Sequence, residues 1–148
     1  MIKPKALGHI VLKVRDLERA EKFYTQVLGL RVTGRLDTRM VFLSAGDKHH
    51  DLALYRVGPR AKDAEQRQVG LLHFAWELES FDELKRAYTV LKEKGVPIVG
   101  AMDHGISKGV YFLDPDGNEV EVYCDNPPQE WEKLPNPFGG NAPVRLDD

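Results

Sequence analysis

The order of secondary-structure signals in residues 7–57 recurs in residues 71–124, and this internal repeat limits the possible folds more than any other feature of the chain. The first copy opens with an aliphatic, strand-like segment, residues 7–14. A helix is predicted next, because Asp16 is a suitable N-cap, apolar residues then recur at helical spacing, and Gly29 can end the helix. Three shorter strands are predicted to follow, over residues 30–36, 40–45 and 52–57.

The second copy follows a polar linker, residues 58–68, and has the same order of elements. Its helix is predicted by a capping box, in which the side chains of Ser80 and Glu83 each accept a hydrogen bond from a backbone N–H, and by Gly95 at its end. The sequence Asp-Pro-Asp-Gly at 114–117 predicts a tight turn. The expected strands of this copy occupy residues 71–78, 97–102, 109–113 and 119–124.

Two βαβββ modules predict an α+β fold. We expect the modules at about residues 6–57 and 70–125, within a single domain (1–125), since 148 residues leave little room for a second core. Residues 126–148 form a Pro/Gly-rich C-terminal tail that holds five of the nine prolines and shows no periodicity. The tail is either anchored on the domain or on a partner subunit through Trp131 and Phe138, or it is loosely ordered.

Charge and composition argue against several classes of partner. The net charge of -2 gives no basic field that would attract nucleic acid or an anionic membrane surface. No apolar segment approaches the roughly 20 residues that span a bilayer, and residues 1–5 lack the apolar stretch of a secretory signal. The single cysteine, Cys124, cannot form an intrachain disulfide. We therefore expect a cytoplasmic protein with no nucleic-acid or membrane partner.

Overlaying the two copies places His9 on His73, each as the third residue of its module's first strand. A lone histidine on a strand is usually structural, but two at equivalent positions of a repeat would face each other across its pseudo-twofold axis. A carboxylate on the last strand would complete a metal site. Glu121 lies between two valines, where an unpaired carboxylate would be costly, whereas Glu119 directly follows the turn and is expected to be solvated. Two imidazoles and one carboxylate leave three coordination positions open, as in non-haem Fe(II) oxygenases.

These features resemble the glyoxalase / bleomycin-resistance / extradiol dioxygenase superfamily, which has the vicinal oxygen chelate fold, over residues 7–125. The resemblance rests on Gly-His-Ile-Val-Leu-Lys-Val-Arg-Asp-Leu at 8–17, Phe-Tyr at 23–24 with Leu-Gly-Leu at 28–30, and Tyr-Phe-Leu-Asp-Pro-Asp-Gly-Asn at 111–118. It implies that the two modules form a curled mixed sheet around a metal-binding cleft, with His9, His73 and Glu121 as ligands. Single-domain relatives usually dimerise, sometimes by exchanging modules, so the resemblance also implies a homodimer.

Within this superfamily the chain is most similar to catechol 2,3-dioxygenase-like, type I extradiol enzymes, in a one-domain form. It shares with them His-Asp-Leu-Ala-Leu at 50–54 and His-Gly-Ile-Ser at 104–107, ahead of Tyr111. Glyoxalase I and related epimerases resemble this layout but use a fourth ligand, a glutamate on the strand that closes the first module, where this chain has Ala53. Fosfomycin-resistance enzymes also have the tyrosine, but they need a cluster of cations, and only Lys108 is nearby.

The similarity implies Fe(II)-dependent cleavage of a catechol-type aromatic substrate by O₂, with Mn(II) or another divalent metal as the alternative cofactor. In such an enzyme His50 would be the acid–base group beside bound O₂, His104 would hydrogen-bond the substrate oxygen, and Tyr111 would donate to the catecholate oxygen. Each has a structural interpretation as well: the histidines as exposed loop residues, the tyrosine as core. Two other functions stay open. One is a metal-dependent glyoxalase-like isomerase, lyase or thiol transferase on the same three ligands, and the other is a non-catalytic module that binds an aromatic small molecule.

Overall fold

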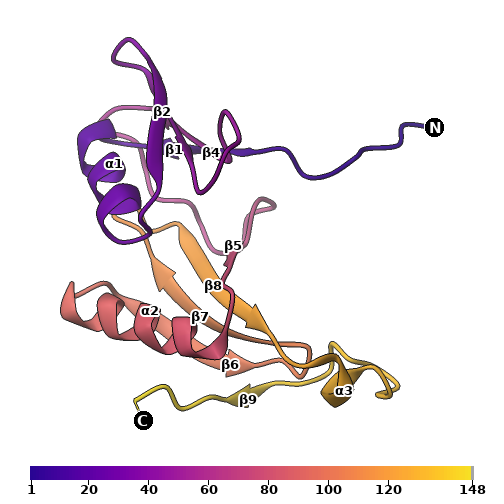
Figure 1. Ribbon diagram of the computed structural model, residues 1–148. Helices are drawn as coiled ribbons and strands as arrows, with labels where there is room; N and C mark the ends of the chain where they lie inside the picture. Colours follow the sequence, from indigo (N-terminus) through magenta and orange to yellow (C-terminus); the bar gives the residue numbers. More distant parts are fainter. Residues whose placement is uncertain (148) are drawn as a thin grey trace. The chain divides into compact units, whose positions relative to one another are not determined.

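The computed structural model describes residues 1–147 and divides them into two compact units, one of residues Met1–Asp63 and one that begins at Ala64 (Figure 1). Each unit contains a mixed β-sheet with an amphipathic helix on one face. This agrees with the predicted α+β class and with the two predicted modules.

The first unit is a four-stranded sheet with the strand order β1-β4-β3-β2. The outer strand β1 is parallel to β4, and the other pairs are antiparallel. Helix α1 begins after Asp16, whose carboxylate accepts a hydrogen bond from the backbone N–H of Arg19 at 3.0 Å, as expected of an N-cap. Ala20 and Tyr24 are the residues of α1 that are fully buried. The elements of this unit are β1 (Ile10–Val14), α1 (Leu17–Gln26), β2 (Arg31–Leu36), β3 (Met40–Ser44) and β4 (Leu52–Arg56).

The second unit is a five-stranded sheet with the strand order β5-β8-β7-β6-β9. Its core lies between α2 and one face of the sheet, where Leu84 of α2 and Phe112, Val120 and Val122 of the strands are buried. Ser80 caps α2 by accepting a hydrogen bond from the backbone N–H of Glu83. The elements are β5 (Phe74–Glu77), α2 (Phe81–Glu93), β6 (Ile98–Asp103), β7 (Ser107–Leu113), β8 (Glu119–Asp125), α3 (Pro128–Trp131) and β9 (Ala142–Pro143).

Apart from β9, the two sheets have the same strand order and equivalent registers. In each, the first strand pairs in parallel with the last, with Val11 opposite Ala53 in the first unit and Ala75 opposite Glu121 in the second. Each also has an irregularity in its second strand, between Val32 and Gly34 and between Ile98 and Gly100. The internal repeat expected from the sequence is therefore confirmed by strand register.

The starts of the two first strands were predicted three residues too early. β1 begins at Ile10 and β5 at Phe74, because the parallel ladders begin at the pairs Ile10–Leu52 and Phe74–Val120. His9 and His73 therefore directly precede their strands instead of being the third residue in them. The shift is the same in both copies, so the two histidines remain equivalent in the repeat. The other predicted boundaries agree with the structure to within about two residues.

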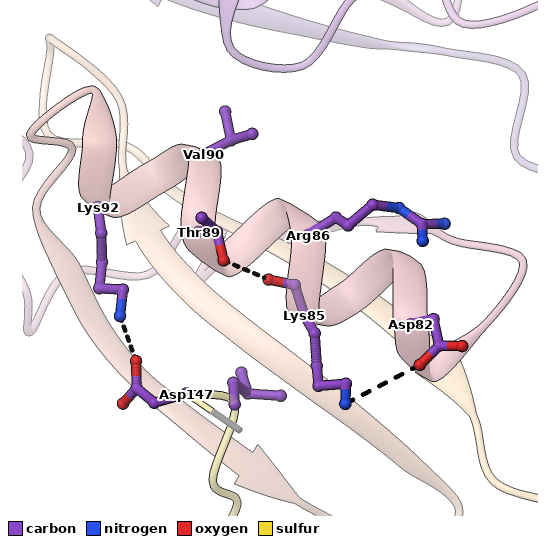
Figure 2. Close-up of a pocket in the computed structure, with 8 residues that line it drawn as sticks. Asp82, Lys85, Arg86, Thr89, Val90, Lys92 and Asp147 are labelled. Carbon is purple, nitrogen blue, oxygen red and sulfur yellow. Dashed lines mark hydrogen bonds and ion pairs between the residues drawn. The ribbon is translucent and has the colours of Figure 1, made fainter.

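The C-terminal tail packs on the second unit. Its strand β9 adds to the edge of β6, and the indole N–H of Trp131 donates to the carbonyl of Asn126 at 3.0 Å. Phe138, the other suggested anchor, is 74% exposed. Leu146 is buried, and Asp147 forms an ion pair with Lys92 of α2 (Figure 2). None of the helices in residues 1–147 has the length and apolar character needed to cross a membrane.

Candidate functional site

A cluster of polar side chains lies on the face of the second sheet that is turned away from the apolar core. Because side chains alternate along a strand, Val120 and Val122 enter the core while Glu119 and Glu121 occupy the opposite face. The imidazole Nε2 of His73 lies 3.2 Å from Oε2 of Glu121, and its Nδ1 lies 3.8 Å from Oε1 of Glu119. Glu121 is only 7% exposed. The pair His73–Glu121 therefore brings a ring nitrogen and a buried carboxylate together.

Gly109 of β7 provides the space for the Glu121 carboxylate. A Cβ atom built at Gly109 would lie 2.3 Å from Oε1 of Glu121, which is closer than real Cβ contacts come. Any larger residue at this position would push the carboxylate out of its present place beside His73. The sequence did not predict this role of Gly109, because the role depends on a close approach between neighbouring strands.

Tyr111 and His104 complete the cluster in the second unit. The Tyr111 hydroxyl is 2.9 Å from Nε2 of His104, and the Tyr111 ring lies edge-on to His73, with 5.3 Å between ring centroids. Burial, together with a hydrogen bond to Glu121 and the negative charges of Glu121 and Glu119, raises the pKa of Tyr111 well above its usual value. The hydroxyl therefore keeps its proton at neutral pH and acts as a hydrogen-bond donor.

The first unit gathers three histidines. The rings of His9 and His50 lie 4.3 Å apart between centroids, and Phe42 contacts His50 edge-on at 5.2 Å. Nδ1 of His49 is 2.6 Å from Nδ1 of His50, so one ring must donate and the other accept. Burial, followed by the neighbouring charges of His9 and His49, lowers the pKa of His50, although Asp51 opposes the shift. Sequence reasoning gave His49 no role, although its position next to His50 could have suggested one.

The predicted site residues are thus distributed over both units. The second unit brings together His73, Glu121, Tyr111 and His104, and the first brings together His9 and His50. Among residues 1–147, no group of three or more His, Cys, Asp or Glu side chains has an arrangement that could by itself hold a metal ion.

The residues of the second unit nevertheless suit a divalent metal. Imidazole nitrogen and carboxylate oxygen are ligands that such ions commonly take, and here they converge within 3.2 Å in a site of low exposure. Nδ1 of His73 is buried and has no hydrogen-bond partner among the described residues. His73 and Glu121 therefore fit part of a metal site, which further ligands would have to complete.

The repeat also shows what stands in the first unit at the place of Glu121. In the first sheet, Ala53 pairs with Val11 on one side and Phe42 on the other. In the second sheet, Glu121 pairs with Ala75 and Tyr111 in the same way. Ala53 is therefore the counterpart of Glu121. The first unit therefore has no carboxylate at the position that would offer a second glutamate ligand.

Comparison with known proteins gives consistent matches. A family model described as the Glyoxalase/Bleomycin resistance protein/Dioxygenase superfamily matches residues 6–122. Catechol-2,3-dioxygenase of Bacillus subtilis (strain 168) is 38% identical over 86% of this chain and 44% of its own length. Glutathione transferase FosA of Serratia marcescens is 30% identical over 80% of each chain. The crystal structure of lactoylglutathione lyase from Agrobacterium tumefaciens superposes with a TM-score of 0.65 at 29% identity, over 82% of this chain and 94% of that one.

These relatives differ in length and in the activity that their names state. The chain spans 44% of the length of the Bacillus subtilis catechol-2,3-dioxygenase and 63% of that of biphenyl-2,3-diol 1,2-dioxygenase 3 of Rhodococcus globerulus. It spans most of the length of the transferase and of the lyase. The match to the family model covers both modules of the repeat and all three predicted metal ligands. The chain therefore belongs to the Glyoxalase/Bleomycin resistance protein/Dioxygenase superfamily.

Proposed function

We propose that this chain is an extradiol ring-cleavage dioxygenase that acts on a catechol-type aromatic and uses Fe(II) held by His9, His73 and Glu121. The observation that carries the proposal is the Tyr111–His104 hydrogen bond beside the His73–Glu121 pair. A protonated hydroxyl and an imidazole thus lie next to two side chains of the kinds that bind metal ions. The hydroxyl can hydrogen-bond a phenolic oxygen, and the imidazole can accept a proton from it. The similarity to a catechol-2,3-dioxygenase supports the same substrate class.

The proposed set of three ligands favours this reaction over an isomerase. Ala53 occupies the position equivalent to Glu121, so the proposed set has three ligands. Three ligands leave positions open for both catechol oxygens and for O₂. When bound, Fe(II) would hold the two reactants together and carry electrons between them.

The residues of the chain would supply orientation and proton transfer. Tyr111 would donate its retained proton to a substrate oxygen near Glu121, and His104 would stabilise that hydroxyl from its other side. His50 would be the acid–base group on the side of His9, where its ring already lies against the proposed ligand. We also propose that the protein is a cytoplasmic homodimer. Sedimentation analysis tests the dimer, which a single species with the mass of one chain would contradict.

A thiol-transferase or isomerase activity on the same ligands is the second candidate. It is favoured by the similarity to glutathione transferase FosA, which covers 80% of each chain, and to lactoylglutathione lyase. Such an enzyme would turn over its substrate without O₂. A non-catalytic aromatic-binding module is the third candidate, and it would need no metal for binding.

The first test is oxygen uptake by protein reconstituted anaerobically with Fe(II) and supplied with a panel of catechols. We expect O₂ consumption that matches the appearance of a yellow ring-fission product. Metal binding without O₂ uptake on any catechol would favour the thiol-transferase or isomerase candidate. Aromatic binding that is independent of metal would favour the binding module.

Replacing His50 by glutamine is expected to lower ring cleavage by about a hundredfold, the usual size of a general acid–base contribution, with little change in metal content. The matched control is His49→Gln, because His49 contacts His50 but is exposed. Steady-state turnover with metal analysis distinguishes the two variants. Near-normal turnover in the His50 variant would show that the acid–base group lies elsewhere.

Replacing Gly109 by alanine is expected to weaken metal affinity by roughly 10- to 100-fold, the size of effect seen when a ligand loses its orientation. The new methyl group would displace the Glu121 carboxylate, whose Oε1 lies within 2.3 Å of the built Cβ. The metal-free fold should tolerate the change, since a carboxylate at the end of a flexible side chain can move. Metal titration and thermal unfolding of the metal-free variant check both statements. Unchanged affinity would mean that Gly109 does not fix the position of Glu121 as a ligand.

A further inference from the structure

The C-terminal tail approaches the turn that carries His104 closely. A Cβ atom built at Gly140 would lie 2.4 Å from the carbonyl carbon of His104 and 2.6 Å from the backbone nitrogen of Gly105. Both contacts are with backbone atoms, which cannot move aside as a side chain can. Gly140 therefore has to be a glycine for the tail to lie where it does.

The turn itself is fixed by a network of polar contacts. The carboxylate of Asp103 accepts a hydrogen bond from the backbone N–H of Gly105 at 2.8 Å and from the side-chain amide of Asn126 at 3.0 Å. The same amide donates to the carbonyl of Gly105 at 2.8 Å, and Lys108 bonds to both Asn126 and Asp103. Burial alone would raise the pKa of Asp103, but these hydrogen bonds lower it, so the carboxylate stays charged and the network intact at neutral pH.

The tail is attached at the same place. β9 pairs with β6 at Met102 and Asp103, directly before the turn, and Asn126, which begins the tail, is 4% exposed. Gly140 lies two residues before β9. Its backbone position relative to His104 is therefore set by strand pairing on one side and by the Asn126 contacts on the other.

This arrangement constrains the protonation of the His104 ring. Nδ1 of His104 lies 3.2 Å from the carbonyl oxygen of Gly140, and a carbonyl oxygen can only accept. Nδ1 must therefore carry a proton. With the ring held in this way, Nε2 faces the Tyr111 hydroxyl at 2.9 Å.

We infer that Gly140 is a positioning residue whose carbonyl accepts the Nδ1–H of His104 and so turns Nε2 of that ring toward the Tyr111 hydroxyl. The tail thereby fixes the orientation of the His104 ring. The catalytic meaning of this arrangement rests on the proposed function, but the protonation of Nδ1 does not.

The direct test is the tautomer of His104 in the ¹⁵N-labelled, metal-free full chain, read from ¹⁵N–¹H correlations of the imidazole ring at about pH 8.5, where an ordinary imidazole is neutral. We expect a protonated Nδ1. A protonated Nε2 with an unprotonated Nδ1 would overturn the inference. This measurement needs no variant, so it decides the tautomer even if a substitution at Gly140 prevents folding.

Gly140→Ala tests whether the tail is the cause. The methyl group should displace the Gly140 carbonyl, and the Nδ1–H tautomer should lose its dominance. The matched control is Gly139→Ala, since a Cβ there comes no closer than 3.4 Å to the backbone oxygen of Asn136, an ordinary contact. A folded Gly140→Ala chain with the wild-type tautomer would contradict the assigned role of the tail.

Kinetics separate this inference from the proposed function. For the Fe(II)-loaded enzyme, we expect Gly140→Ala to lower kcat for the catechol by about a hundredfold, the usual acid–base contribution, with KM and metal content nearly unchanged. An Nδ1–H tautomer in a protein without O₂ uptake would refute the dioxygenase and leave the tautomer inference standing. Ring cleavage by a protein with the Nε2–H tautomer would do the reverse.

Discussion

Replacing Glu121 by glutamine is expected to abolish metal retention and ring cleavage while making the metal-free protein slightly more stable. Glu121 is 7% exposed, and its described partners are His73 and the Tyr111 hydroxyl. A buried carboxylate is costly to desolvate, whereas an amide of the same shape costs less and still accepts the tyrosine hydrogen bond. We expect a gain of about 1 kcal/mol in the metal-free state.

The loss of activity should exceed the roughly 100-fold that follows when an outer-shell partner of a metal ligand is lost. Metal content after dialysis, turnover and unfolding with and without Fe(II) give the three readouts. The control is Glu77→Gln, an exposed carboxylate at the end of β5, which should behave as wild type. A Glu121→Gln protein that keeps one metal ion per chain would remove Glu121 from the proposed ligand set.

We expect the Ala53→Glu protein to retain the metal but to cleave the ring more than about a hundredfold more slowly. This decrease in rate is larger than the one that follows when an outer-shell partner of a metal ligand is removed. The strand register makes Ala53 the counterpart of Glu121, so the new carboxylate would stand where a fourth ligand belongs. A fourth protein ligand would fill a position that the substrate or O₂ needs.

This variant should also make folding depend on metal. Ala53 is fully buried, and an uncompensated charge there should cost at least about 3 kcal/mol. A bound divalent ion would offset much of that cost. The matched control is Ala53→Gln, which adds a side chain of similar size without an anionic ligand, so metal should not rescue its stability. Ring cleavage that survives in the glutamate variant would argue that Ala53 does not face the metal.

The sequence predicted the repeat well because its signals are local. Asp16 and Ser80 cap the helices as expected, and the turn at 114–117 forms as expected, with the N–H of Gly117 donating to the carbonyl of Asp114 at 3.0 Å. The first strands were predicted to start too early, because the leucines in residues 7–9 and 71–73 are typical of strands. The partner strands do not extend far enough to pair with these residues. Pairing depends on β4 and β8, which lie far away in the sequence.

The site was predictable only where the repeat or a known motif pointed to it. His73 and Glu121 do lie together, as do His104 and Tyr111. The roles of Gly109 and Gly140 could not be predicted, because each depends on how closely the backbone approaches a segment distant in sequence. The composition of residues 126–148 predicts only that the tail has no regular secondary structure. Its contact with His104 follows from its pairing with β6.

The short strand β9 also bears on self-association. It covers the edge of β6 at Met102 and Asp103, and the N–H of Val144 donates to the carbonyl of Ala101 at 3.2 Å, so this part of the sheet edge is closed to another chain. The irregularity between Ile98 and Gly100 disturbs that edge, and Pro143 in β9 has no N–H to offer an incoming strand. The tail that contacts His104 therefore also covers an edge of the sheet. A tail variant that loses activity must be shown to remain dispersed before its loss is attributed to the histidine.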